Sequence, residues 1–154
     1  MKMRKGFTLV ELLIVIVIIG VLAAAMLLST TSATASAKAS TIITDLRSMK
    51  AALLLLYADS MDNMPKIDDA LKSLRPYIDN PEKYLGTNSG FSIVAGTGTN
   101  GAGKWLIAYA INDKMKGSDL DDVKKKLAEK AAKVGLYQDD KTSAAYTTND
   151  VVYM

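Results

Sequence analysis

A long apolar run near the N-terminus constrains this chain more than any other feature. Every residue from 7 to 28 is apolar except Thr8, Glu11 and Gly20. As an α-helix, a run of about 22 residues would be roughly 33 Å long, which matches the hydrocarbon thickness of a bilayer. Secretory signal peptides have shorter apolar cores, and their small cleavage-site residues follow the core. The run therefore predicts a membrane-spanning helix rather than a secretory signal.

Positive charge is concentrated just before this run. Lys2, Arg4 and Lys5 lie within the first five residues, and cations beside a membrane helix hold that end in the cytoplasm. The 154 residues carry 19 Lys and Arg against 16 Asp and Glu, a net charge of +3. Because these three residues account for the excess, it does not indicate a folded nucleic-acid-binding surface.

The chain contains no Cys and no His. A disulfide framework, a thiol nucleophile and a Cys-based metal site are excluded. The commonest general base and the commonest metal ligand are also missing. Most of the usual enzyme sites therefore cannot be built from these residues, and we expect no catalytic residues, no metal site and no cofactor.

Glu11 is the one charged residue inside the apolar run. A carboxylate near the middle of a bilayer costs about 2.5 kcal/mol or more, so it usually has a partner. Glu11 is also close enough to Gly6 that it could reach the lipid headgroups instead. The residues alone leave both interpretations open.

The residues around Glu11 resemble a known processing signal. The sequence KGFTLVELLIVI, residues 5–16, looks like the class III signal of type IV pilins and pseudopilins. The resemblance implies that a prepilin peptidase cuts between Gly6 and Phe7 and that the new Phe7 amine is methylated. It further implies that Glu11 pairs with the N-terminal amine of a neighbouring subunit in a helical filament. An inner-membrane assembly platform and minor pilins are the other partners that the resemblance implies.

The chain departs from many members of that family in two ways. Its first Pro is Pro65, so the apolar helix lacks a helix-bending proline, although the hydroxyl residues of segment 29–32 could loosen it. It also lacks the Cys pair that closes a C-terminal loop in many Gram-negative pilins. Loop packing must therefore replace that disulfide.

Beyond the apolar run, the helical pattern continues to about residue 59 and becomes amphipathic. Five apolar residues recur at helical spacing, namely Ile42, Leu46, Met49, Leu53 and Leu56. We therefore expect four segments. These are a leader at 1–6, a membrane or filament-core helix at 7–28, its amphipathic continuation at 29–59, and a globular head at 60–154.

The head pattern predicts short helices and a small sheet. We expect a helix over 68–74, a β-hairpin over about 91–111 with its second strand central, a helix over about 118–134, and a C-terminal strand. The predicted fold class is α+β, a long N-terminal helix packed on a small antiparallel sheet, as in type IV pilins.

Three features of the head could suggest ligands. The segment GTGTNG, residues 96–101, fits a dinucleotide-binding fingerprint, but a strand follows it where a helix is required. We therefore predict a flexible hairpin loop there. Lysines 124, 125, 126, 130 and 133 should form a solvated helix face, or else an anion-binding patch, so nucleic acid remains a possible but unsupported partner. The tyrosines are scattered along the chain, which favours ordinary packing.

The sequence thus predicts a pilin that forms a type IV pilus and serves adhesion, twitching motility or DNA uptake. It would sit in the cytoplasmic membrane with its head outside the cytoplasm and then enter an extracellular filament. One alternative is a type II secretion pseudopilin, although the Asp- and Gly-rich calcium loop of major pseudopilins is not recognisable. A second alternative is an uncleaved, membrane-anchored binding protein.

Overall fold

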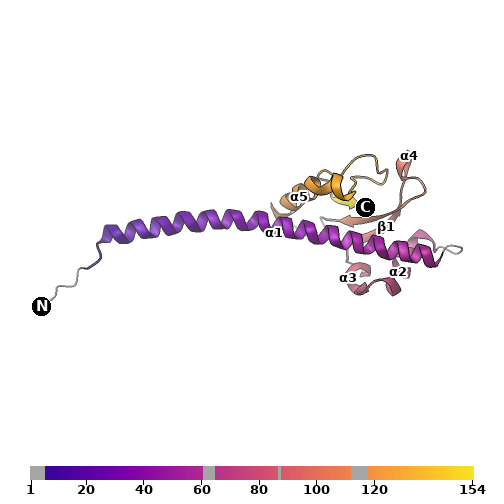
Figure 1. Cartoon of the computed structure of the whole chain (residues 1–154), viewed down its shortest axis with the longest axis horizontal. Helices are drawn as coiled ribbons and strands as arrows, with labels where there is room; N and C mark the ends of the chain where they lie inside the picture. Colours follow the sequence, from indigo (N-terminus) through magenta and orange to yellow (C-terminus); the bar gives the residue numbers. More distant parts are fainter. Residues whose placement is uncertain (1–5, 61–64, 87, 112–117) are drawn as a thin grey trace. The chain divides into compact units, whose positions relative to one another are not determined.

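A computed structural model describes residues 6–60, 65–86, 88–111 and 118–154, with the side chains of 28–31, 68 and 118 excepted. The chain divides into two compact units, of which the first ends at Thr34 and the second spans Ala35–Met154. We refer to the second unit as the head (Figure 1). The helices are α1 (Leu9–Asp59), α2 (Ile67–Ser73), η1 (Arg75–Tyr77), α3 (Pro81–Leu85), α4 (Gly98–Gly101) and α5 (Ser118–Val134). The strands are β1 (Phe91–Ala95), β2 (Trp105–Ala110) and β3 (Val151–Tyr153).

Helix α1 contains 51 residues. Its backbone remains helical through residues 29–32, where the hydroxyl side chains were expected to loosen it. No proline interrupts it, so each backbone N–H can donate to the carbonyl four residues earlier. The prediction of one long N-terminal helix is confirmed.

The part of α1 that lies in the head forms one wall of the hydrophobic core. The predicted apolar stripe is buried there, at Ile42, Leu46, Met49, Leu53 and Leu56. In the view of Figure 1, α5 lies on one side of α1 and α3 lies on the other. Helix α2 contacts strand β1 of the sheet. The stripe therefore faces elements that come from the whole length of the head.

The sheet has three antiparallel strands in the order β1-β2-β3. Ile93 pairs with Ile107 in the hairpin, and Ala110 pairs with Val151 across to the C-terminal strand. The four inner residues of β2 are buried, which fits a strand flanked by partners on both edges. The prediction of a small antiparallel sheet with β2 at its centre is confirmed.

Helix α5 covers the range that the sequence predicts. It ends at Gly135, whose φ of 77° lies in the left-handed region that favours glycine. The N–H groups of Gly135 and Leu136 both donate to the carbonyl of Ala131, which satisfies the end of the helix. Leu136 then enters the core as a fully buried side chain.

Two prolines of the head each lie in the first turn of a short helix, Pro76 in η1 and Pro81 in α3. Proline is accepted there because its missing N–H has no intrahelical partner to lose. The predicted helix 68–74 is found one residue earlier, as α2.

Packing around one tyrosine holds the segment between α5 and β3. Tyr146 is almost fully buried, and its hydroxyl donates to the carbonyl of Asn149 at 2.7 Å. The backbone of Tyr137 pairs with that of Tyr153 at the outer edge of β3. A buried aromatic ring and backbone bridges therefore anchor this loop in a chain that has no cysteine.

Candidate processing and assembly site

The residues named by the processing signal lie at the start of α1. Gly6 and Phe7 precede the helix, and Phe7 is 88% exposed. A Cβ atom built on Gly6 would meet no atom within 4 Å, so the fold itself does not require glycine at this position. Any requirement for glycine must therefore come from an outside partner. The basic cluster of Lys2, Arg4 and Lys5 lies outside the described residues.

Thr8 and Glu11 form a reciprocal cap on the first turn of α1. The Thr8 N–H and hydroxyl both donate to Glu11 Oε2, at 2.8 and 2.7 Å. The Glu11 N–H donates back to Thr8 Oγ1 at 3.2 Å. This arrangement is a capping box, in which the side chains at the N-cap and three residues later satisfy each other's free N–H groups.

The sequence interpretation missed the role of Thr8. The signal was present, because Thr8-Leu9-Val10-Glu11 has the Thr-x-x-Glu spacing of a capping box immediately before an apolar run. Both bonds from Thr8 reach Oε2. Within the described part of the chain, Glu11 Oε1 therefore remains available to a donor from outside.

The first half of α1 presents apolar side chains on every side. Fifteen large hydrophobic residues between Phe7 and Leu27 are exposed, and the described segment 6–27 has no buried residue. Among the described residues, α1 is also the helix whose length and composition would let it cross a membrane. A helix that is apolar all round requires a surrounding apolar phase, either lipid or other helices.

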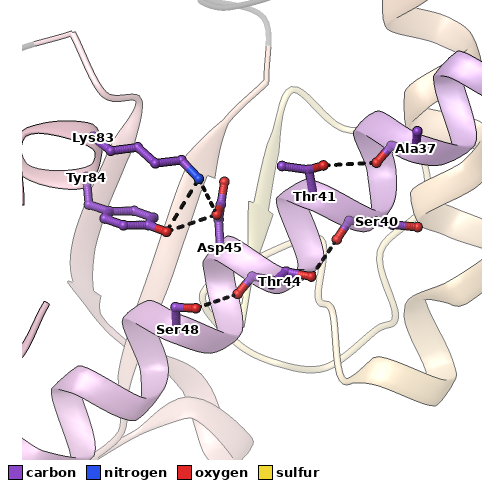
Figure 2. A network of polar contacts seen from close by, with 8 residues as sticks. All are labelled: Ala37, Ser40, Thr41, Thr44, Asp45, Ser48, Lys83 and Tyr84. Atoms are coloured by element: carbon purple, nitrogen blue, oxygen red, sulfur yellow. Dashed lines mark hydrogen bonds and ion pairs between the residues drawn. The ribbon is translucent and has the colours of Figure 1, made fainter. Parts of the chain in front are cut away.

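A second polar cluster lies in the head, where α3 meets α1. Lys83 Nζ lies 2.6 Å from the Asp45 carboxylate, and the Tyr84 hydroxyl donates to the same oxygen at 3.0 Å (Figure 2). The hydrogen bond to Asp45 raises the pKa of Lys83, and burial raises the pKa of Tyr84. Lys83 therefore stays cationic and Tyr84 stays neutral, so the cluster fastens α3 to α1.

The described residues do not assemble a metal-binding cluster. They contain no group of three or more Asp or Glu side chains placed to hold a metal ion. Two tyrosines form an aromatic cluster with Phe91. The centre of the Phe91 ring lies 5.5 Å from that of Tyr84 and 4.5 Å from that of Tyr109. Tyr84 and Tyr109 are buried, so these contacts belong to the core.

The glycine-rich segment 96–101 has a packing role that the sequence analysis did not foresee. Its last four residues form the single turn α4, where a flexible loop was predicted. A Cβ atom on Gly96 would lie 2.3 Å from the carbonyl oxygen of Gly101, and one on Gly101 would lie 2.5 Å from that of Asp140. The Thr97 hydroxyl also donates to the Asp140 carboxylate at 3.0 Å. These glycines therefore let two loops meet backbone to backbone.

The lysines of α5 do not all face solvent, which corrects the predicted basic face. Lys124 is buried and forms an ion pair of 2.5 Å with Asp150. Lys126 pairs with Glu129, and Lys130 donates to the hydroxyl of Ser40. Lys125 and Lys133 remain exposed, so the candidate anion-binding patch is smaller than the sequence suggested.

Comparison with known proteins agrees with the geometry of the N-terminus. A family model for the prokaryotic N-terminal methylation motif matches residues 1–27. No curated protein and no solved structure shows a significant match to the chain. The match covers the segment that contains Gly6, Phe7 and the Thr8–Glu11 cap. The N-terminal segment thus matches a prokaryotic N-terminal methylation motif, in agreement with its resemblance to the class III prepilin signal of type IV pilins and pseudopilins.

Proposed function

We propose that this protein is the structural subunit of a type IV pilus. The methylation motif at residues 1–27 supports a pilin or a pseudopilin, and its position on an exposed apolar helix carries the proposal. The helix spans the cytoplasmic membrane before assembly, with the head outside the cytoplasm, and then packs with other copies in an extracellular filament. The role is non-enzymatic and uses no cofactor.

Processing creates the group that Glu11 needs. A prepilin peptidase cuts after Gly6, which leaves a cationic amine on Phe7, and the same class of enzyme methylates it. When the apolar helix leaves lipid for a bundle of other helices, an unpaired carboxylate would be strongly disfavoured. The Phe7 amine of a neighbouring copy pairs with Glu11 and fixes the axial register. Removing one partner of such a buried ion pair costs about 3–5 kcal/mol. Each contact between neighbouring subunits would be weakened by that amount.

Assembly requires the remaining machinery that the motif implies. An inner-membrane platform extracts the processed subunit, and minor pilins initiate the filament. Contacts in such a filament are heterologous, because each copy presents one surface to the copy before it and a different surface to the copy after it. Adhesion, twitching motility and DNA uptake are the activities that a filament of this kind would serve.

Processing can be tested by peptide mapping of the mature N-terminus together with electron microscopy of filaments sheared from cells. We expect a chain that begins with methylated Phe7, and Gly6→Val should retain the full precursor. A wild-type chain that keeps residues 1–6 would contradict the proposal and favour an uncleaved anchored protein.

The role of Glu11 can be tested with a matched pair of carboxylate variants. Glu11→Ala should reach the membrane but yield few or no filaments, because the Phe7 amine loses its partner. Glu129→Ala is the control, since Glu129 is exposed on α5 and pairs only with Lys126 among the described residues. Normal piliation of Glu11→Ala would refute the assembly role.

The second candidate is a type II secretion pseudopilin, which the same motif also supports. The two can be separated in cells that lack this protein. A pilin should be needed for surface filaments, whereas a pseudopilin should be needed for release of secreted enzymes. Loss of secretion with filaments intact would favour the pseudopilin.

A further inference from the structure

The glycine-rich segment of the head contains an Asn-Gly dipeptide, Asn100-Gly101. Asn100 is the only asparagine of the chain that a glycine follows. An asparagine can lose ammonia when the backbone nitrogen of the next residue attacks its side-chain amide carbon. Glycine favours this attack, because it has no Cβ atom beside that nitrogen and its backbone turns freely. Asn100 is therefore the asparagine of this chain whose sequence context most favours deamidation.

The two residues of the dipeptide lie in different surroundings. Asn100 is exposed, whereas Gly101 is buried. Both belong to α4, a single turn in which the Ala102 N–H donates to the carbonyl of Gly98 at 2.9 Å. The amide that reacts is therefore accessible to water, and the nitrogen that attacks it belongs to a packed turn.

A second loop covers Gly101. The Thr97 N–H donates to the carbonyl of Asp140 at 2.9 Å, and the Thr97 hydroxyl donates to the Asp140 carboxylate at 3.0 Å. A Cβ atom on Gly101 would lie 2.5 Å from that same carbonyl oxygen. We call segments 96–104 and 139–142 the paired loops. They meet so closely at Gly101 that no added atom fits there.

Ring closure requires the paired loops to separate. The new bond between the Gly101 nitrogen and the Asn100 side chain reorients the peptide that joins these residues, and that peptide lies inside the α4 turn. A region packed as densely as a protein interior has no room for such a rotation. Attack is therefore limited to the fraction of molecules in which the loops have opened locally.

We propose that Asn100 is a deamidation site, that opening of the paired loops sets its rate, and that the reaction then holds the loops apart. In the first step, the Gly101 nitrogen bonds to Asn100 Cγ, and the N–H proton leaves with the side-chain NH₂ group as ammonia. Water then opens the five-membered imide ring. Cleavage at one carbonyl gives aspartate, and cleavage at the other gives isoaspartate, in which the backbone runs through the former side chain.

Isoaspartate does not fit between the paired loops. It inserts a carbon atom into the backbone just before Gly101, where the loops have no spare room. It also places a new carboxylate opposite the loop that carries Asp139 and Asp140, and like charges repel at short range. Because the ammonia is lost, the change is permanent. The inference concerns the head alone and does not depend on filament assembly.

The rate can be measured on the full-length chain in detergent at mildly alkaline pH, followed by peptide mapping with mass spectrometry. The peptide that contains Asn100 should change mass as an amide becomes a carboxyl group, and part of it should be isoaspartate. The folded chain should react at least about tenfold more slowly than the same chain in denaturant, because only opened molecules react. Equal rates would overturn the inference. A folded chain that stays unmodified while the denatured chain reacts would also overturn it.

Variants of one hydrogen bond test the role of loop opening. Thr97→Ala and Asp140→Ala remove the same bond from opposite loops, and each should speed deamidation roughly 2–10-fold, the equivalent of one hydrogen bond. Thr97→Ser keeps the hydroxyl and should react at the wild-type rate. Thr148→Ala is the matched control, since Thr148 is exposed outside the paired loops. Wild-type rates for both alanine variants would contradict control of the reaction by the loops.

The state of the loops after the reaction can be followed by trypsin cleavage after Lys141, an exposed residue of the second loop. Chains with isoaspartate at position 100 should be cut there several-fold faster than unmodified chains. Asn100→Asp carries the charge without the added backbone atom and should be cut less rapidly than the isoaspartate form. Equal cleavage of modified and unmodified chains would show that the reaction does not hold the loops apart, and would overturn that part of the inference.

Discussion

The two parts of α1 carry similar side chains in opposite environments. Ile16, in the first part, is 59% exposed, whereas Leu46, in the head, is fully buried. Burying a side chain of this size contributes about 1.5–3 kcal/mol. The head gains that energy within one chain, but residues 7–27 can gain it only from lipid or from other copies. One part of the helix therefore contributes to the core of the head, and the other presents an apolar surface that its own chain does not cover.

The difference arises from the pattern rather than from the amount of apolar residue. In the head, apolar residues form a stripe that other elements cover, with polar residues such as Arg47 and Lys50 outside it. In residues 9–27 they surround the helix, so no single partner element could cover them all. An all-round apolar helix needs several neighbours, which a membrane or a helical filament provides.

The largest effect should come from removing buried volume in the head. Leu46→Ala should lower the free energy of unfolding of the head by about 2–5 kcal/mol, since it leaves a cavity in the core. Ile16→Ala removes a side chain that contacts little within its own chain, so the head should unfold as in the wild type. Chemical denaturation in detergent, followed by the fluorescence of the single Trp, Trp105, measures both.

The same pair of variants tests in cells whether the two parts of α1 contribute separately to the stability of the head and to filament yield. Leu46→Ala should reduce the amount of stable subunit, whereas Ile16→Ala should keep it and affect only filament yield. If Ile16→Ala destabilised the head as strongly as Leu46→Ala, the two parts of α1 would not be energetically separate.

A second prediction concerns contacts that only glycine permits. Gly101→Ala should destabilise the head by about 1–3 kcal/mol, because the new Cβ atom would lie 2.5 Å from the carbonyl oxygen of Asp140. Ala102→Ser is the matched control, since Ala102 is the exposed next residue. Gly20→Ala, in the apolar helix, would meet no atom within 4 Å and should leave the head unchanged. A wild-type unfolding curve for Gly101→Ala would show that the two loops can separate at no cost.

The sequence predicted most of the features that depend on local periodicity. The buried stripe of α1, the range of α5 and the central position of β2 all follow from spacing within one segment. The start of α1 follows from a short motif, and the capping box at Thr8 and Glu11 could have been found in the same way. Such features need only residues that are near one another in the chain.

The features that the sequence did not predict depend on distant partners. In the sequence, Lys124 looks like one of several exposed lysines. In the structure it pairs with Asp150, 26 residues later. In the sequence, the glycines of segment 96–101 resemble a nucleotide-binding motif. In the structure, Gly101 packs against the backbone of Asp140. The Asp45, Lys83 and Tyr84 cluster joins two helices far apart in sequence. Charge pairing and close backbone approach between such segments leave no periodic signal.

A third prediction, with a smaller effect, is that the free energy of unfolding of the head decreases at alkaline pH. Burial raises the pKa of Tyr146, whereas tyrosines in the unfolded chain ionise near about pH 10. Above that pH the unfolded state loses the proton first, so the free energy of unfolding falls as pH rises. The raised pKa of Lys83 acts in the same direction. Residues 7–27 contain no Tyr or Lys, so they add nothing to this loss.

Tyr146→Phe tests this decrease. At neutral pH it should cost about 1 kcal/mol, through loss of the hydrogen bond to the carbonyl of Asn149. Above about pH 10 its stability should fall less steeply than that of the wild type, because one titrating group is gone. Tyr57→Phe is the control, since Tyr57 is exposed. Equal slopes for Tyr146→Phe and wild type would show that Tyr146 does not cause the decrease.

The smallest effect should come from an ion pair on the surface of the head. Lys38 lies 2.9 Å from Asp119, and both side chains are largely exposed, at 44% and 59%. Water and salt screen such a pair, so Lys38→Ala should change the free energy of unfolding by less than about 1 kcal/mol. Denaturation in low and high salt measures the difference, which should shrink as salt increases. A salt-independent loss of about 2 kcal/mol or more would mean that Lys38 is needed to hold α5 against α1, and that the head depends on charge as well as on its core.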